Sequence, residues 1–531
     1  MTYLWNTACF LYCVVINTAL FVSMYIDAIS EVLQNMDMTS ILVFCVVFLL
    51  CYYALRTPKF IAPGPVIFPL LGNIPQLAGR NPLRLFRKWR KQYGDVFSVY
   101  MGNQLLVVLN GYKTIKEALV TRGNVFSDRP PNFILDKIKE GKGLVFTSGT
   151  SWKMQRKFTL NCLQDLGFGR NSFEVCIADE AKILIELMEQ TSDAPLNLKY
   201  VLTTCVSNVI CGILFGRRFS HDDKQFLEVV ANISDDVKLL GNASILMNCF
   251  PFLQYLPGDL LGTKTIMEHK QVLQKFLEDL YQSHQSTLDE SYPRDFMDFY
   301  LIEMKRNLTL SSKEENTYNK TQLMALAADL FGAGTETTST TLLWVILYFL
   351  HYPDVQEKCF DEVQTVLGLE RSPSLDDRTN LPYSEATILE TLRIAAVAPL
   401  AVPHATTRDV YFQGFRIPKE SSILINLDSI FHDSDIFKDP GVFRPERFLD
   451  SSGQVMKPEE FIPFSCGRRI CIGEKVAQME LFIFLTSMMQ KFQFLPDDPC
   501  NLPDLEGNLG IAYSPKDFKV RIVRRQDVKS Y

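Results

Sequence analysis

The segment from residue 461 to 473 reads Phe461-Ile-Pro-Phe-Ser-Cys-Gly-Arg-Arg-Ile-Cys471-Ile-Gly473 and is the strongest local signal in the chain. It places Cys471 among glycines and basic residues, directly before an apolar helical pattern over 476–489. Glycines let backbone N–H groups turn toward a sulfur atom. Basic neighbours and a helix N-terminus lower the pKa of a thiol and favour the thiolate that binds metal. This segment, called the cysteine loop below, therefore suits a metal-binding thiolate. A buried structural cysteine in a turn is the alternative interpretation.

A long helical pattern lies upstream of the cysteine loop, over 320–350. Its apolar positions alternate in steps of three and four, as expected of a buried helix, and it contains Ala333-Gly334-Thr335-Glu336-Thr337-Thr338. A glycine in mid-helix costs roughly 1 kcal/mol relative to alanine. Either a flat ligand against the backbone or close packing of a second helix can offset that cost, and both interpretations stay open. A dinucleotide-binding loop is rejected because the helical pattern continues through it and Thr337 replaces the last glycine.

The rest of the body predicts one large domain. Long helical patterns alternate with short strand-like runs, including a hairpin of 97–100 with 104–109, and no flexible linker interrupts residues 80–525. We predict a mainly α domain with a minor β part over 76–531. Before it, Ala62-Pro-Gly-Pro-Val-Ile-Phe-Pro69 cannot be helical, because proline fixes φ and lacks a donor. We therefore predict a stiff hinge over 58–75.

Two uncharged apolar stretches precede the hinge. Ala8–Tyr25 and Met38–Leu55 are 18 residues each, near the roughly 20 that a helix needs to cross a bilayer. The connector between them has acidic side chains but no Lys or Arg, whereas Arg56 and Lys59 follow the second stretch. The positive-inside rule then predicts that residues after 55 face the cytosol. We predict a membrane anchor over 1–57 with helices at about 8–25 and 38–55. A first stretch that lies on the membrane interface is the alternative for 8–25.

Composition excludes several classes of protein. Hydrophobic residues make up 47% of the chain and charged residues 21%, which excludes a disordered or fibrous protein. The net charge of −6 argues against a nucleic-acid partner. Thirteen cysteines without regular spacing fit a reducing compartment better than a disulfide scaffold. Six histidines, no two at ligand spacing, argue against a histidine-rich zinc or non-haem iron centre.

The cysteine loop resembles the haem-binding loop of the cytochrome P450 superfamily, F-x-x-G-x-R-x-C-x-G. Phe464, Gly467, Arg469, Cys471 and Gly473 match its fixed positions. The resemblance implies a P450 fold with haem b as cofactor and Cys471 as the thiolate ligand of its iron, a ligand that promotes O–O cleavage. Cys466 is a rival thiol in the same loop, but the spacing of the motif selects Cys471.

Other segments match the same family in the same order along the chain. The resemblance assigns Thr337 a hydrogen bond in oxygen activation and Glu336 a part in proton delivery. It also implies a structural network of three charged side chains, from E-x-x-R and P-E-R-F segments: Glu390, Arg393 and Arg447. The remaining matches are positions that contact haem, most of them at its propionates: Arg129, Trp152, Arg156, His404, Arg469, Phe464 and Gly334. For His404, a histidine whose hydrogen bonds are satisfied within the core or a loop is the alternative interpretation.

The wider pattern is similar to the microsomal, family-2-like branch, and the double apolar N-terminus is similar to a subgroup associated with fatty acid hydroxylation. Ser465-Cys466 departs from the family, whose members usually carry a glycine-bearing pair there. The resemblance implies an endoplasmic reticulum membrane protein whose catalytic domain faces the cytosol. Its activity would insert one oxygen atom from O2 into a lipophilic substrate, such as a fatty acid, a steroid or a xenobiotic.

Electrons must come from a partner, because the chain has no convincing dinucleotide or flavin loop. The resemblance implies NADPH–cytochrome reductase, docked around Cys471, with cytochrome b5 as a second candidate donor and membrane lipids as further partners. A local basic patch can steer an acidic reductase despite the net charge. Its candidate residues are Lys153, Arg156, Lys157, Arg468 and Lys475.

Two other functions stay open at this point. One is a peroxide isomerase of the same fold that needs neither O2 nor a reductase, against which Glu336-Thr337 argues because such chemistry needs no proton relay. The other is a membrane-tethered haem binder without catalysis, which would show no reductase-dependent oxygen consumption.

Overall fold

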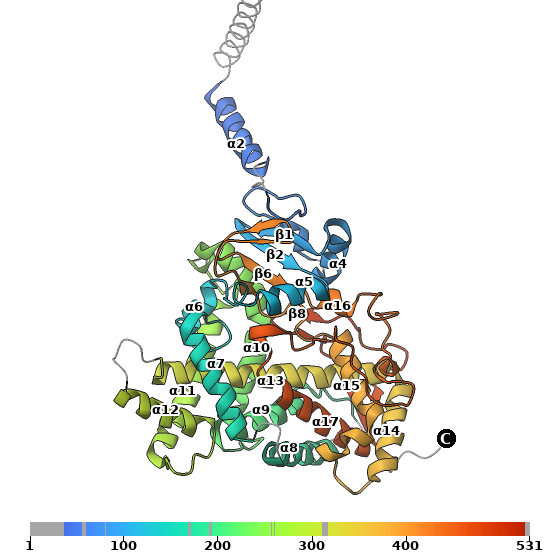
Figure 1. Cartoon of the computed structure of the whole chain (residues 1–531). Helices are drawn as coiled ribbons and strands as arrows, with labels where there is room; N and C mark the ends of the chain where they lie inside the picture. The colour runs from blue at the N-terminus through green and yellow to red at the C-terminus, as the bar shows by residue number, and fades with distance from the viewer. Residues whose placement is uncertain are drawn as a thin grey trace, which may run out of the picture.

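The computed structural model describes residues 37–55, 60–79, 81–167, 171–190, 194–255, 257–259, 261–310 and 317–525. Helices dominate this part of the chain and the strands are short, so the prediction of a mainly α fold with a minor β part is confirmed (Figure 1). The predicted apolar helix over 8–25 lies outside the described residues.

The described α-helices have the following bounds: α2 Met38–Leu55, α3 Ile74–Leu77, α4 Pro82–Tyr93, α5 Tyr112–Lys116, α6 Phe133–Lys139, α7 Gly149–Asp165, α8 Asn171–Glu189, α9 Lys199–Phe215, α10 Lys224–Cys249, α11 Thr263–Thr287, α12 Phe296–Leu310, α13 Lys320–His351, α14 Pro353–Leu367, α15 Pro382–Ile394, α16 Asp428–Phe431 and α17 Glu474–Lys491. The strands are β1 Val96–Met101, β2 Gln104–Leu109, β3 His404–Ala405, β4 Val410–Phe412, β5 Phe415–Ile417, β6 Ser422–Ile425, β7 Phe492–Pro496, β8 Asn508–Leu509, β9 Tyr513–Ser514 and β10 Val520–Arg524.

Helix α13 crosses the middle of the body, where it packs against α9, α15 and α17 (Figure 1). It begins at an asparagine cap, because the Asn319 side chain accepts a hydrogen bond from the backbone N–H of Gln322. Every residue from Thr338 to Leu350 is buried, so this half of the helix is enclosed on all sides. The helix predicted over 320–350 is therefore confirmed, with its end at His351.

The main sheet lies between α13 and α2, with the strand order β1-β2-β6-β3 (Figure 1). Strands β1 and β2 form the predicted hairpin, whose tight turn holds Gly102 at φ +59°. Strand β2 pairs in parallel with β6, which comes from the distant C-terminal part of the chain. Strand β3 pairs with β6 through His404 and Ile423, and this pairing delivers His404 to the centre of the molecule.

The three predicted scaffold charges meet in the core. Arg393 donates two hydrogen bonds of 2.8 Å to the carboxylate of Glu390, one to each oxygen. Arg447 donates a third, of 2.9 Å, to Oε1 of the same carboxylate. Glu390 and Arg393 are completely buried, so the network predicted from the two short motifs is confirmed.

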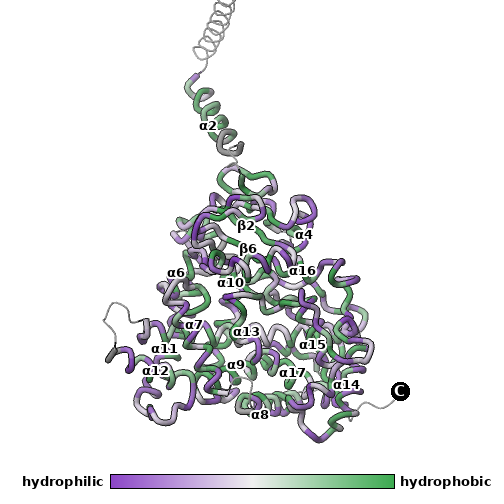
Figure 2. The backbone as a smooth tube through the Cα atoms, in the orientation of Figure 1, coloured by the Kyte–Doolittle hydropathy of each residue, from purple (hydrophilic) through white to green (hydrophobic). Residues whose placement is uncertain are grey.

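The N-terminal end of the described chain is apolar. The bounds of α2 coincide with the second apolar stretch, and α2 stands apart from the body (Figures 1 and 2). None of the helices within the described residues is both long and apolar enough for a membrane span. The proline-rich segment packs onto β1: the Ser98 N–H donates to Pro63 O, and a Cβ at Gly64 would lie 1.9 Å from Ser98 O.

Candidate functional site

A cavity of about 350 Å³ lies between α13 and the cysteine loop. Its walls are mostly apolar, with side chains from α9, α13 and α17. Nine of the ten predicted site residues line it: Cys471, Arg129, Trp152, Arg156, His404, Arg469, Phe464, Gly334 and Thr337. The tenth, Glu336, does not.

The backbone of the cysteine loop turns Cys471 toward this cavity. Gly467 has φ +74°, and a Cβ there would lie 2.1 Å from the carbonyl oxygen of Leu119, so only glycine fits. Ser465 has φ +65°, in the left-handed region where a side chain is strained. The Cys471 N–H donates to the Phe464 carbonyl, 3.1 Å away, which closes the loop.

The two thiols of the loop differ in what they face. Cys471 is open to the cavity, whereas Cys466 packs against the apolar cluster behind the loop and does not line the cavity. Burial raises the pKa of the Cys466 thiol to about 11. The structure thus favours Cys471 as the ligand, in agreement with the motif spacing.

The expectation that loop composition alone lowers the pKa of Cys471 is wrong in its direction. Burial raises this pKa, and the backbone N–H groups of Gly473 and Glu474 and the charge of Arg156 offset the effect only in part. The sulfur therefore needs a cation in the cavity in order to stay a thiolate.

Three guanidinium groups border the cavity without an acidic partner. Burial and the charge of Arg156 lower the pKa of Arg129 to about 9, and burial with both of its neighbours lowers that of Arg469 to about 8. Among the described residues, no carboxylate forms an ion pair with Arg129, Arg156 or Arg469. Because a guanidinium keeps its charge in proteins, these groups need an anion from outside the chain.

Backbone carbonyls and one aromatic ring hold the guanidinium groups in place. Arg129 donates to the carbonyls of Val402 and Pro403, each at 2.8 Å. The guanidinium of Arg469 lies 3.6 Å from the centroid of the Trp152 ring and donates to the carbonyl of Ser127 at 2.8 Å. A fixed cluster of cations is thereby aimed at the cavity.

His404 is a buried histidine that also borders the cavity. Its Nδ1 lies 2.6 Å from the carbonyl oxygen of Phe126, and burial together with the charge of Arg129 lowers its pKa to about 3. The ring is therefore neutral, with Nε2 left for a ligand. His404 is hydrogen-bonded within the core, as the alternative interpretation expected, and it also lines the cavity, as the resemblance implied.

On α13, Gly334 and Thr337 share the face toward the cavity. A Cβ at Gly334 would lie 2.7 Å from Cδ1 of Ile210 on α9, so close helix packing explains the glycine, and Gly334 lines the cavity as well. Thr337 donates to the carbonyl of Ala333 at 2.9 Å. Its side chain is exposed only to the cavity side of the helix.

Glu336 points away from Thr337. It is 3% exposed and accepts a hydrogen bond of 2.7 Å from Ser234 on α10. Burial raises its pKa, an effect that Lys199 and Lys238 reduce. Consecutive helical residues point about 100° apart, so the structure does not bring this acid and the Thr337 hydroxyl together.

Glu480 on α17 is a cavity residue that sequence reasoning missed. It is completely enclosed, borders the cavity and accepts a hydrogen bond of 2.9 Å from Thr338 on α13, while its Oε1 has no partner among the described residues. Burial raises the pKa of this carboxyl to about 8. A lone acid inside the apolar pattern Met479-Glu-Leu-Phe-Ile-Phe-Leu485 was the available signal.

We expect Glu480→Gln to change how stability depends on pH. The folded state holds the Glu480 proton up to about pH 8, whereas the pKa of a glutamate side chain in the unfolded chain is about 4.5. Its stabilising effect is therefore complete below about pH 4.5 and is lost as pH rises to 8, a change on the order of 5 kcal/mol. Glutamine stays neutral at every pH. In thermal unfolding, the stability of the variant relative to wild type should therefore increase between pH 6 and pH 9. Parallel pH profiles for the two proteins would contradict this expectation.

The residues present fit haem b. The group offers iron to a sulfur ligand, an apolar ring to the cavity walls and two carboxylates to cations. The cavity provides the Cys471 sulfur, which requires a cation, and three guanidinium groups, which require anions. The iron of haem b meets the first requirement and its two carboxylates meet the second.

Comparison with known proteins agrees with this fit. A family model described as cytochrome P450 matches residues 62–522. Cytochrome P450 2C16 of Oryctolagus cuniculus is 40% identical over 433 residues, which cover 81% of this chain and 87% of that protein. Cytochrome P450 2B19 of Mus musculus is 38% identical over 482 residues, covering 90% and 97%, and cytochrome P450 2U1 of the same organism is 37% identical over 485 residues, covering 88% and 91%. The family uses haem b. The chain therefore belongs to the cytochrome P450 family of monooxygenases, among microsomal family-2 relatives.

Proposed function

We propose that the chain is a haem-thiolate monooxygenase that inserts one oxygen atom from O2 into a lipophilic substrate, with electrons from NADPH–cytochrome reductase. The observation that carries this proposal is one apolar cavity that joins the Cys471 sulfur, a cluster of unpaired cations and the Thr337 hydroxyl. Haem b supplies one-electron and oxygen chemistry at such a site when it is bound.

The chain's own residues bind and orient this group. Cys471 would hold the iron through its sulfur, and Phe464 and Gly334 would contact the ring. Arg129, Arg156 and Arg469 would bind the two carboxylates, and the neutral ring of His404 would border the same end of the group. Trp152 acts by stacking on Arg469, which holds the guanidinium toward the cavity. The apolar walls exclude water and accept an apolar substrate.

Proton supply is the proposed role of Thr337 and Glu336. The Thr337 hydroxyl faces the cavity and hands a proton toward its centre. Glu336, whose pKa is raised by burial, is the proposed proton store on the other side of α13. Since the two side chains do not touch, water must connect them.

Thr337→Ala tests this function. We expect product formation with reductase and NADPH to fall by about a hundredfold, in the range typical of positioned acid–base groups, while NADPH oxidation continues and releases hydrogen peroxide. Ser339→Ala is the matched control, because Ser339 also donates to the carbonyl four residues earlier but is absent from the cavity wall. The ratio of product to NADPH consumed is the measurement.

The outcomes separate the rival functions. A Thr337→Ala variant that rearranges lipid hydroperoxides at the wild-type rate without reductase would favour the peroxide isomerase. A wild-type protein that binds haem but shows no reductase-dependent oxygen consumption with any lipid substrate would favour the non-catalytic haem binder.

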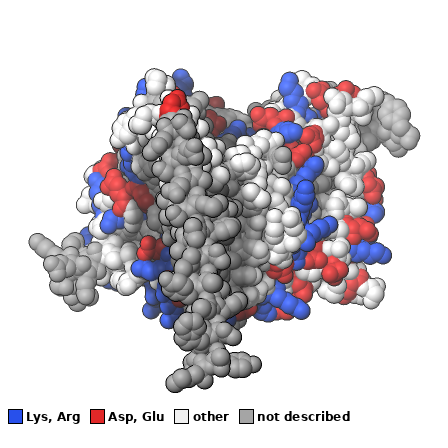
Figure 3. Space-filling model, turned by 90° about the horizontal axis from the view of Figure 1, so that it is seen from above, with Lys and Arg blue, Asp and Glu red and all other residues white. Residues whose placement is uncertain are grey.

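We also propose that residues 1–57 anchor the chain in the endoplasmic reticulum membrane, with a hinge over 58–75 and a cytosolic catalytic domain over 76–531. This placement is supported by apolar residues at the end of the body that lies next to α2 (Figures 1 and 2). The exposed ones in the hinge are Phe60, Val66, Phe68, Leu70 and Leu71. Seen from this end, basic and acidic side chains are interspersed, and no single sign of charge dominates (Figure 3). The exposed apolar side chains of the hinge suit contact with lipid.

The reductase is proposed to dock on the opposite side of the cysteine loop from the cavity. Arg156 on α7 donates to the carbonyl of Ile470, so α7 and the cysteine loop share one surface. Lys153, Lys157 and Arg468 are exposed there. An acidic partner would be steered to these cations and to Lys475, and cytochrome b5 is the second candidate for the same surface.

A further inference from the structure

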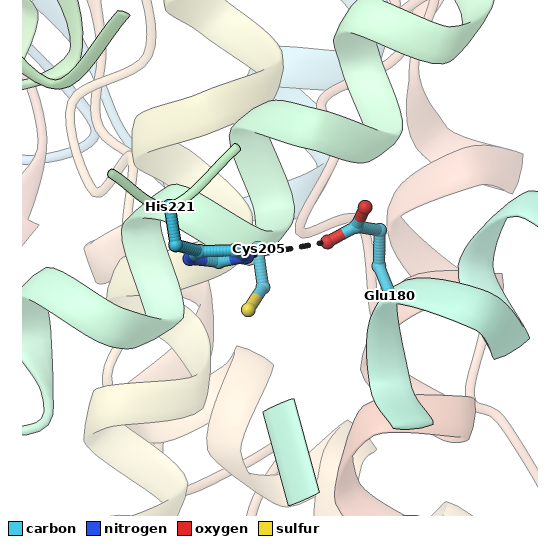
Figure 4. A group of neighbouring side chains, drawn as sticks. All are labelled: Glu180, Cys205 and His221. Atoms are coloured by element: carbon cyan, nitrogen blue, oxygen red, sulfur yellow. Dashed lines mark ion pairs between the residues drawn. The ribbon is translucent and has the colours of Figure 1, made fainter. Parts of the chain in front are cut away.

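A second group of metal-ligating side chains lies outside the haem cavity (Figure 4). Glu180 is on α8, Cys205 on α9, and His221 in the segment between α9 and α10. Each contributes one atom, namely a carboxylate oxygen, Sγ and a ring nitrogen, and the three atoms lie within 4.8 Å of one another. Figure 4 shows the three side chains converging from separate elements on one space.

Two of these atoms are buried without a hydrogen-bond partner among the described residues. They are Glu180 Oε2 and His221 Nε2, which lie 3.8 Å apart. That separation is too long for a hydrogen bond. An unsatisfied buried polar atom costs about 1–3 kcal/mol, so two of them facing the same gap require an explanation. Glu180 is 1% exposed and Cys205 is fully buried, so bulk water does not provide the missing hydrogen bonds.

The charges around the gap suit a divalent cation. Arg218 donates to the other carboxylate oxygen, Oε1, and thereby leaves Oε2 of Glu180 directed at the gap. Burial raises the pKa of the Cys205 thiol, so that thiol is neutral unless a cation is beside it. A thiolate and a carboxylate carry two negative charges, of which Arg218 offsets one, so the bound group would attract a cation.

The spacing of the atoms suits a small tetrahedral ion. Zinc takes sulfur at about 2.3 Å and nitrogen or oxygen at about 2.0–2.2 Å, so its ligand atoms lie roughly 3.3–3.6 Å apart. Oε2 and Nε2 lie 3.8 Å apart and all three ligand atoms lie within 4.8 Å of one another, so the group must contract around an ion to reach this spacing. A mixed set of sulfur, nitrogen and oxygen selects zinc-class ions over Mg²⁺ and Ca²⁺. The His221 side chain is 17% exposed, so part of the ring reaches the surface although Nε2 itself is buried.

We propose that Glu180, Cys205 and His221 form a structural site for one Zn²⁺-class ion, which joins α8, α9 and the segment after α9. On binding, the S–H bond of Cys205 breaks, its proton leaves to solvent and a sulfur–metal bond forms, with no change of oxidation state. Histidine spacing could not reveal the site, because its ligands come from three separate elements. The site does not depend on the proposed oxygen chemistry.

The test uses the full-length haem-loaded protein. A chelator first removes bound divalent metal, and the protein is then titrated with Zn²⁺ against a chromophoric competitor. We expect one tightly held Zn²⁺ per chain and a zinc-edge X-ray absorption spectrum with one sulfur neighbour at about 2.3 Å. Cys205→Ala should lose that sulfur signal and weaken binding at least about a hundredfold. His221→Gln, at a partly exposed position, should also weaken binding and disturbs the core less.

Cys211→Ala is the matched control, since Cys211 is a fully buried cysteine on the same helix but outside the group. It should bind Zn²⁺ as wild type does. Zinc that is held equally well by Cys205→Ala and Cys211→Ala, or no zinc held more tightly than about 10 μM, would overturn the proposal. The group would then be an ion pair of Arg218, Glu180 and His221 beside an inert thiol.

Discussion

Cys471→Ser should abolish the spectral signature of a thiolate-bound haem. In the reduced protein with carbon monoxide, the wild type should give a strongly red-shifted Soret band, and the variant should not. The reason is geometric, because Cys471 is the loop thiol that opens into the cavity. Reductase-supported turnover should fall to the background, since a hydroxyl oxygen does not provide the electron donation of a thiolate.

Cys466→Ser is the control for this experiment. Cys466 lies five residues earlier but packs against the apolar cluster behind the loop. We expect this variant to keep the red-shifted band, with some loss of stability. A band that disappears in Cys466→Ser and persists in Cys471→Ser would show that the ligand assignment is wrong.

Glu390→Ala should have the largest effect on folding. Glu390 is fully buried and is the acidic partner of Arg393 and Arg447. Its removal leaves two guanidinium groups in the core without an anion, which costs about 3–5 kcal/mol. We expect most of the expressed protein to lack haem and the remainder to unfold at a markedly lower temperature.

Asp504→Asn is the comparison that makes the result specific. Asp504 pairs with Lys516 at 2.6 Å, but both side chains are about half exposed. An exposed pair contributes about 0–1 kcal/mol, so this variant should behave as wild type. Equal losses of stability in the two variants would contradict the view that the buried network is a scaffold of the fold.

Periodicity and motif spacing predicted the parts of the molecule that depend on local sequence. The apolar steps over 320–350 predicted α13 almost to its ends. The Glu390 network was implied by the family resemblance of two short motifs. Residues far apart in the chain, such as Arg129 and Arg469, could be assigned to one cavity only through the resemblance. Their mutual repulsion and their lack of an acidic partner are properties of the folded chain.

The remaining features depend on the direction in which each side chain points and on its burial away from solvent. Sequence places Glu336 beside Thr337, but the helix turns the two side chains to different neighbours, Ser234 and the cavity. Basic neighbours predicted an acidic Cys471 thiol, yet burial outweighs them. Glu480 was missed because no spacing rule marks a single enclosed acid.

The parallel pairing of β2 with β6 also orders events during synthesis. Asn110, just after β2, bonds to Asn426, 316 residues later, and Arg469 bonds to Ser127 across 342 residues. Such distant contacts form only after the intervening chain has left the ribosome. Almost the whole chain must therefore be translated before Cys471, the proposed iron ligand, leaves the ribosome, so haem binding at that residue can begin only late in synthesis. A message truncated anywhere upstream of Cys471 yields a chain that cannot mature.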